Sequence, residues 1–192
     1  MTSIRTCLKH VAKHGLPALG GRRGVLLAAG AGLILLLAVA LRCAYWRQYC
    51  ALPVGQVAIG TAAAEHDSWA RRILLGGTLG EHTGSHAPLY PLVLAGMYRL
   101  TGVRISLVRG LQLAFDVVSL LLISGALWRL IGARCALACA GLWAVYQPLI
   151  YYSAEISSEG LAVLLLSSVL FLWAAAHRPG GRPPLKAWPL AL

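Results

Sequence analysis

The chain has 192 residues, of which 58% are hydrophobic and only 12% are charged. Soluble domains carry about 25% charged residues, so this composition argues against a soluble domain and favours an integral membrane protein. The net charge of +11 would also suit a nucleic-acid-binding protein. The basic residues punctuate apolar runs instead of clustering with aromatic residues, however, so no nucleic-acid partner is expected.

The N-terminal region is basic and is followed by the first apolar run. Residues 1–24 contain several lysines and arginines and no acidic residue, and residues 25–41 read VLLAAGAGLILLLAVAL. This run approaches the roughly 20 residues that cross a bilayer. We predict an uncleaved membrane anchor behind a cytoplasmic N-terminus. A cleaved signal sequence is the alternative, because Ala38 and Ala40 form an A-x-A pattern and Arg22–Arg23 resembles a twin-arginine signal.

The next segment, residues 43–104, is predicted to form the first outer loop. It opens with aromatic residues that suit a membrane interface, Tyr45, Trp46 and Tyr49. Within it, HDSWARRILLGG (residues 66–77) predicts a short amphipathic helix with Asp67 as its N-cap. LYPLVLAGMYRL (residues 89–100) is too short to span a bilayer and is predicted to lie along the interface as a second short helix.

Three further apolar segments follow, at about residues 105–127, 135–152 and 157–176. Together with the first run they predict an all-α, polytopic membrane protein with about four transmembrane helices and short interfacial helices in the first outer loop. The organisation is therefore a basic N-terminus (1–24), a transmembrane region (25–176), and a basic turn that leads into the start of a further, truncated span (177–192).

The distribution of charges predicts the orientation of the chain. With residues 1–24 in the cytoplasm, the turns that carry Arg129 and Arg134 and then Arg178, Arg182 and Lys186 are also cytoplasmic, as the positive-inside rule expects. Five of the six acidic residues then lie on the outer side, namely Glu65, Asp67, Glu81, Glu155 and Glu159. Asp116 remains within a span, where an acidic residue is expected to have a partner. We predict that Arg109, on the same helix face, pairs with it, and that Glu155 is a solvated loop residue.

Four short motifs carry a resemblance to a known family: PLYP at 88–91, R-x-x-Q at Arg109 and Gln112, PLIYYS at 148–153 and SEGL at 158–161. Their order and spacing from about residue 25 to 176 resemble the N-terminal portion of the GT-C glycosyltransferases. The similarity is to the protein-mannosyltransferase and lipid A aminoarabinose-transferase type, which includes bacterial family 39-like proteins. The resemblance implies a multi-pass protein of a bacterial-type inner (plasma) membrane. Members are longer, so a truncated form is expected here.

The resemblance also implies an activity and roles for residues. Such an enzyme moves a sugar, with inversion, from a polyprenyl-phosphate donor to a protein, lipid or glycan acceptor at the outer face. Asp67 matches the proposed catalytic base, whereas Ser68 stands where the family often has a second acid. Arginines suit the donor phosphate because they can bind it in a bidentate way. The candidate substrate-binding residues are Arg71, Arg72, His86, Arg109 and Glu159.

Three alternatives remain open. A divalent metal could be held by His66, His82 or His86 with Asp67 or Glu81, although no spacing among them is diagnostic; no other cofactor is expected. A non-catalytic membrane scaffold or assembly subunit is the second alternative. A transporter or channel is the third, but it would need polar residues through several spans, and apart from Asp116 the spans lack them.

Overall fold

The computed structural model describes residues 22–58, 60–77 and 88–177, and this part of the chain is helical with no strand. The elements are α2 (Arg22–Ala51), η1 (Pro53–Gln56), α3 (Thr61–Leu74), α4 (Leu89–Thr101), α5 (Ile105–Leu130), α6 (Ala133–Val145), α7 (Gln147–Ala154) and α8 (Ser158–Ala176). The predicted all-α class is therefore confirmed for the described residues. Glu81, His82, His86 and, from the predicted terminal segments, residues 1–21 and 178–192 lie outside them.

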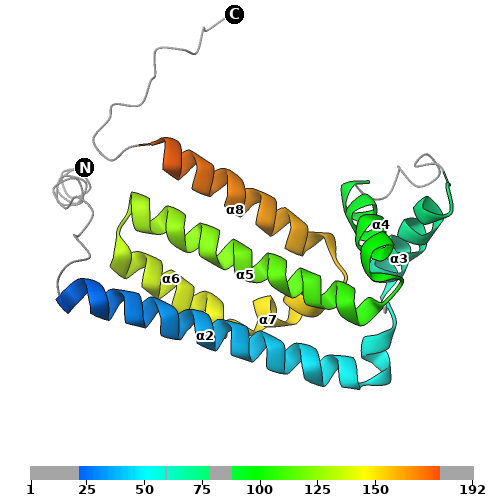
Figure 1. Ribbon diagram of the computed structural model, residues 1–192, viewed down its shortest axis with the longest axis horizontal. Helices are drawn as coiled ribbons and strands as arrows, with labels where there is room; N and C mark the ends of the chain where they lie inside the picture. The colour runs from blue at the N-terminus through cyan, green and yellow to red at the C-terminus, as the bar shows by residue number, and fades with distance from the viewer. Residues whose placement is uncertain (1–21, 59, 78–87, 178–192) are drawn as a thin grey trace, which may run out of the picture.

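The long helices form a bundle around α5. α8 packs along one side of α5, and α2 and α6 lie on the other side (Figure 1). Three helices are long and apolar enough to cross a membrane, over Gly24–Ala51, Ile105–Leu130 and Ser158–Ala176. The first of them continues to Ala51, beyond the predicted end at residue 41. Tyr45, Trp46 and Tyr49 therefore belong to a helix and not to a loop.

The predicted span over residues 135–152 is not one straight helix. It is divided into α6 and α7, which together pass the length and hydropathy criteria for a span but are bent by 63°. Tyr146 between them has an extended backbone (φ −71°, ψ 106°), and α7 has a proline in its first turn, Pro148. A proline has no N–H to continue the hydrogen bonds of α6, and in a continuous helix its ring would clash with the carbonyl of the residue four positions earlier, so the helix direction changes here.

A pair of short helices, α3 and α4, packs together beyond one end of the long helices (Figure 1). Their apolar faces form a core with the start of α5, in which Ala70, Leu94 and Val108 are 0% exposed. The prediction that Asp67 is the N-cap of its helix is wrong, because α3 begins at Thr61. The alanines at 62–64 are strong helix formers that extend the helix upstream, and Gly60, with φ +96°, stands at its start.

The two ends of the bundle differ in charge. We call one the basic end: it consists of the starts of α2 and α6 and the ends of α5 and α8 (Figure 1). By position in the chain it carries Arg22, Arg23, Arg129 and Arg134, and none of its described residues is acidic. The other end, which we call the α3–α4 end, holds every described acidic residue except Asp116.

Candidate functional site

Asp67 lies in the middle of α3 and is held by side chains from two helices. Arg71, one turn later, places Nε 3.1 and 3.0 Å from the two carboxylate oxygens. The hydroxyl of Tyr98, on α4, donates a hydrogen bond to Oδ1 of the same carboxylate. The Asp67 side chain is 17% exposed. A carboxylate offers about four lone-pair positions, so Asp67 can accept a further hydrogen bond from the open side.

The local sequence explains this arrangement. Residues four apart on a helix share a face, so Arg71 is the natural partner of Asp67. The Arg71 side chain is 48% exposed, and its guanidinium carbon lies 5.8 Å from the centre of the Tyr98 ring. Tyr98 itself is 2% exposed. Burial, and next the hydrogen bond to Asp67, raise the pKa of the Tyr98 hydroxyl well above its ordinary value. Tyr98 therefore remains a neutral donor to Asp67.

The other candidate on α3, Arg72, is exposed and lies with Arg71 in the last turn of the helix. Two cations there are favourable because the carboxyl end of a helix carries partial negative charge. Both arginines are exposed, and Arg71 is the one in contact with Asp67. The structure brings together two of the predicted site residues, Asp67 and Arg71, whereas Arg72 lies on another face of the same helix.

Arg109 forms a separate, fully buried cluster at the start of α5. Its guanidinium donates to the carbonyl oxygens of Ala154 (2.9 Å) and Val57 (3.0 Å). It also lies 3.5 Å from Oε2 of Glu155 and 4.5 Å from the centre of the Tyr49 ring. These contacts tie α5 to the end of α7 and to the segment after η1. Arg109 is thus a packing residue here, with no exposed face for a donor phosphate.

Two predictions about this cluster are wrong. Arg109 does not pair with Asp116, because seven residues of helix separate them by about 10 Å along the axis. Glu155 is not a solvated loop residue: its side chain is 14% exposed and accepts hydrogen bonds from Arg109 and from the Tyr49 hydroxyl, the latter at 3.3 Å. The buried guanidinium draws this carboxylate inward, since an unpaired buried charge is costly.

Asp116 pairs instead with Arg42 of α2. Arg42 Nε donates to Oδ2 of Asp116, and Trp143 Nε1 donates to Oδ1 at 3.2 Å. The remaining nitrogens of Arg42 reach the carbonyl oxygens of Ala144 and Trp143, where the helical hydrogen bonds of α6 end. This network connects α2, α5 and α6 in the interior of the bundle. It compensates both charges and leaves no role for Asp116 beyond packing.

A third polar group connects α4, α5 and α8. Gln112 Nε2 donates to the hydroxyl of Tyr90 at 2.7 Å and to the carbonyl of Ser157 at 3.2 Å. The Tyr90 ring stacks edge-on against His66, with centroids 4.8 Å apart. Burial raises the pKa of the Tyr90 hydroxyl above its ordinary value. The R-x-x-Q motif thus supplies two structural side chains, Arg109 and Gln112.

Glu159, the last described candidate, is exposed in the first turn of α8. It lines a small cavity of about 110 Å³ together with Gln112, Asp116 and Tyr152. His86 lies outside the described residues. Among those that are described, no three His, Cys, Asp or Glu side chains come close enough to hold a metal ion.

Arg42 and Tyr98 are participants that the sequence analysis did not assign, and Glu155 is one to which it gave a different role. Arg42 had a signal: it is the arginine that directly follows the first apolar run, and Asp116 is the acidic residue within a span. The role of Tyr98 had no comparable signal, because it depends on how α4 packs against α3. Comparison of the chain with protein-family models, curated proteins and solved structures found no match.

Proposed function

We propose that this chain is the membrane-embedded N-terminal portion of a GT-C-type glycosyltransferase. It would take a sugar from a polyprenyl-phosphate donor and transfer it to an acceptor hydroxyl at the α3–α4 end of the bundle. The three long helices, with α6 and α7 as a bent fourth span, would lie in a bacterial-type plasma membrane. The basic end would face the cytoplasm, following the positive-inside rule.

One observation carries the proposal: a partly exposed carboxylate, Asp67, stands beside the half-exposed Arg71 on a short helix that ends with a second exposed arginine, Arg72, next to membrane-length helices. This is the combination that transfer from a lipid phosphate requires. The acceptor needs a group that takes its proton, and the donor phosphate needs a cation. The sequence resemblance assigns the first role to Asp67 independently of this geometry.

The chemistry follows from the positions of these side chains. The acceptor oxygen attacks the anomeric carbon of the sugar, the bond from that carbon to the phosphate oxygen breaks, and the acceptor proton passes to Asp67. Polyprenyl phosphate leaves with the bonding electrons and, because phosphate is a good leaving group, needs no general acid. Arg71 is half exposed and can swing from Asp67 towards the phosphate. Tyr98 would keep the carboxylate in place.

The test is sugar transfer by the protein in membranes, with polyprenyl-phosphate mannose and polyprenyl-phosphate aminoarabinose as donors and release of polyprenyl phosphate as the readout. Asp67→Asn preserves the size of the side chain and its hydrogen bond from Tyr98. We expect it to lower the rate by about 100-fold to 10,000-fold, as for loss of a general base. Glu65→Gln, on the same helix, is the matched control and should leave the rate unchanged.

A non-catalytic assembly subunit is the second candidate. It is favoured by the fact that Asp67 already has two partners, Arg71 and Tyr98, which would suffice for a purely structural carboxylate. In that case, Asp67→Asn would retain full activity in any complex of which the chain is a part. Equal rates for Asp67→Asn and Glu65→Gln would rule out Asp67 as the base.

A further inference from the structure

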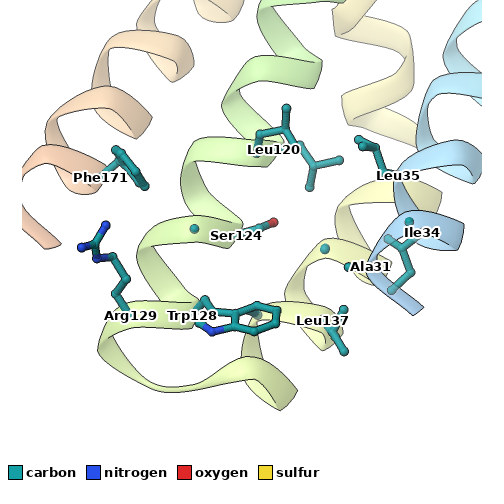
Figure 2. A pocket seen from close by; sticks show the side chains of 14 residues that line it. Ala31, Ile34, Leu35, Leu120, Ser124, Trp128, Arg129, Leu137 and Phe171 are labelled. Atoms are coloured by element: carbon teal, nitrogen blue, oxygen red, sulfur yellow. The ribbon is translucent and has the colours of Figure 1, made fainter. Parts of the chain in front are cut away.

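A cavity of about 360 Å³ lies at the basic end, away from Asp67. Figure 2 shows it over the face of α5, with Ile34 and Leu35 of α2 on one side and Phe171 of α8 on the other. Its volume falls within the range of roughly 300–1,000 Å³ that is typical of sites for small molecules. The cavity is a distinct feature that the proposed sugar transfer does not use.

The walls of the cavity are mostly apolar. Leu120 and Leu137 continue the apolar surface, and the polar groups come from one helix, α5: Ser124, Trp128 and Arg129. Trp128 and Arg129 lie in the last turns of that helix, close to its end at Leu130. The site therefore has a mostly apolar lining with one cationic side chain, Arg129, among its lining residues.

Small residues keep this space open. A side chain at Gly32 would meet no atom within 4 Å, so the α2 side of the cavity is empty. On the α8 side, a Cβ at Gly125 would stand 2.9 Å from the Phe171 ring, so that ring closes against the backbone of α5. The resulting space is small, with a volume of about 360 Å³. A helix with its side chains is about 10–12 Å across, so a single hydrocarbon chain fits this space better than a helix does.

The positive charge of Arg129 indicates which group a bound hydrocarbon chain must carry. Arg129 has no ion pair with any other described residue, and the described part of the basic end contains no carboxylate that could provide one. Arg134, at the start of α6, follows Arg129 closely in the sequence. It is also exposed and adds to the positive charge of the basic end. An arginine binds phosphate through paired hydrogen bonds. An apolar chain with a phosphate at one end matches both parts of the site.

We propose that this cavity binds an anionic phospholipid, with one acyl chain over the face of α5 between α2 and α8 and its phosphate on Arg129. The proposal rests on the membrane placement given under the proposed function but not on sugar transfer. The lipid would come from the leaflet at the basic end, where attraction of basic residues to anionic lipids is strongest. It would fill the gap in the bundle and hold α2 and α5 together.

Native mass spectrometry of the full chain in mild detergent tests the proposal, with phosphatidylglycerol and phosphatidylcholine of identical acyl chains as probes. We expect phosphatidylglycerol to bind about fivefold more tightly, the effect of one basic side chain at an anionic headgroup. Arg129→Gln should abolish this preference. Arg99→Gln, an exposed arginine on α4, should retain it.

A second pair of variants tests the apolar body of the site. Gly32→Leu places a side chain in the cavity without a clash and should reduce binding of both lipids. Gly30→Leu, two residues earlier on α2, also meets no atom but does not line the cavity, and it should leave binding unchanged. Equal affinity for the two lipids, or equal effects of the two glycine variants, would overturn the proposal. So would a lipid-free dimer, since a second copy would then cover the cavity.

Discussion

Buried charges in this bundle are compensated by groups from other helices. Arg42 and Arg109 are both 0% exposed, and each combines a carboxylate with backbone carbonyl oxygens at a place where a helix ends or breaks. Carbonyls at such ends have no helical partner, so they are available to a guanidinium. The end of α6 thereby supplies acceptors for Arg42, and the end of α7 supplies one for Arg109. Arg42 in turn stabilises the end of α6, and Arg109 stabilises the end of α7.

The first prediction concerns the pair of Arg42 and Asp116. Asp116→Ala leaves the Arg42 charge buried without its carboxylate, and we expect the free energy of unfolding to fall by about 3–5 kcal/mol. The double variant Arg42→Met/Asp116→Leu removes both charges and should be more stable than Asp116→Ala alone. Unfolding by SDS titration in mixed micelles, followed by circular dichroism, measures both.

The control for this pair is Val118→Ala, because Val118 is on the same helix and is 43% exposed. Its effect should be much smaller than that of Asp116→Ala. A loss below about 1 kcal/mol for Asp116→Ala, the range of exposed ion pairs, would contradict the prediction.

Partners of individual side chains were the least predictable part of the site. The sequence indicates that Asp116 requires a partner, but it does not indicate which helix provides it. The partner is set by the register between α2 and α5, to which residues 74 positions apart contribute. The Asp67–Arg71 contact is different, because a spacing of four on one helix implies it. Tyr98, the third member, depends again on packing between helices.

Helix existence was predictable, whereas helix limits and breaks were not. Apolar run length and composition indicated the four membrane-length segments and the helices that became α3 and α4. The start of α3 was missed because the alanines before Glu65 have no polar pattern, although they favour a helix. The break before α7 was missed because a proline in an apolar run is compatible with a kink, a break or a tilted continuous helix. The backbone partners of Arg42 on α6, Trp143 and Ala144, follow from that break.

The second prediction concerns η1, the short helix that follows α2. A Cβ at Gly55 would lie 1.9 Å from the backbone oxygen of Tyr49, so Gly55→Ala requires the backbone to move. We expect this variant to loosen the end of α2 and the Arg109 cluster next to it, with a loss of a few kcal/mol. That loss would be large compared with the about 1 kcal/mol of an ordinary point substitution. Thermal unfolding in detergent provides the measurement.

Gly96→Ala is the matched comparison for Gly55→Ala. Gly96 lies within α4, and a Cβ there meets no atom within 4 Å. Because alanine favours a helix over glycine, this variant should raise the stability by about 0.5–1 kcal/mol. If both substitutions changed the stability in the same direction, the close contact at Gly55 would have to be absent in the protein.

At the scale of the whole molecule, the asymmetry between the two ends makes the orientation testable. Arg129 and Arg134 lie at one end without acidic neighbours, while Asp67, Glu155 and Glu159 lie at the other. The proposed donor site and the proposed lipid site are thus on opposite sides of the bundle. Both proposals place the basic end in the cytoplasm, and both would need revision if the chain were inserted the other way round.

The third prediction tests that orientation with single cysteines in a variant from which the five native cysteines have been removed. Ala62→Cys, exposed on α3, should react in intact cells with a maleimide that cannot cross membranes. Arg134→Cys, exposed at the start of α6, should react only after the membrane is permeabilised. The reason is the positive-inside rule, since short loops rich in arginine remain in the cytoplasm. The reverse pattern would place Asp67 in the cytoplasm and exclude transfer at an outer face. Labelling of both cysteines in intact cells would show that the bundle does not separate its two ends across a membrane.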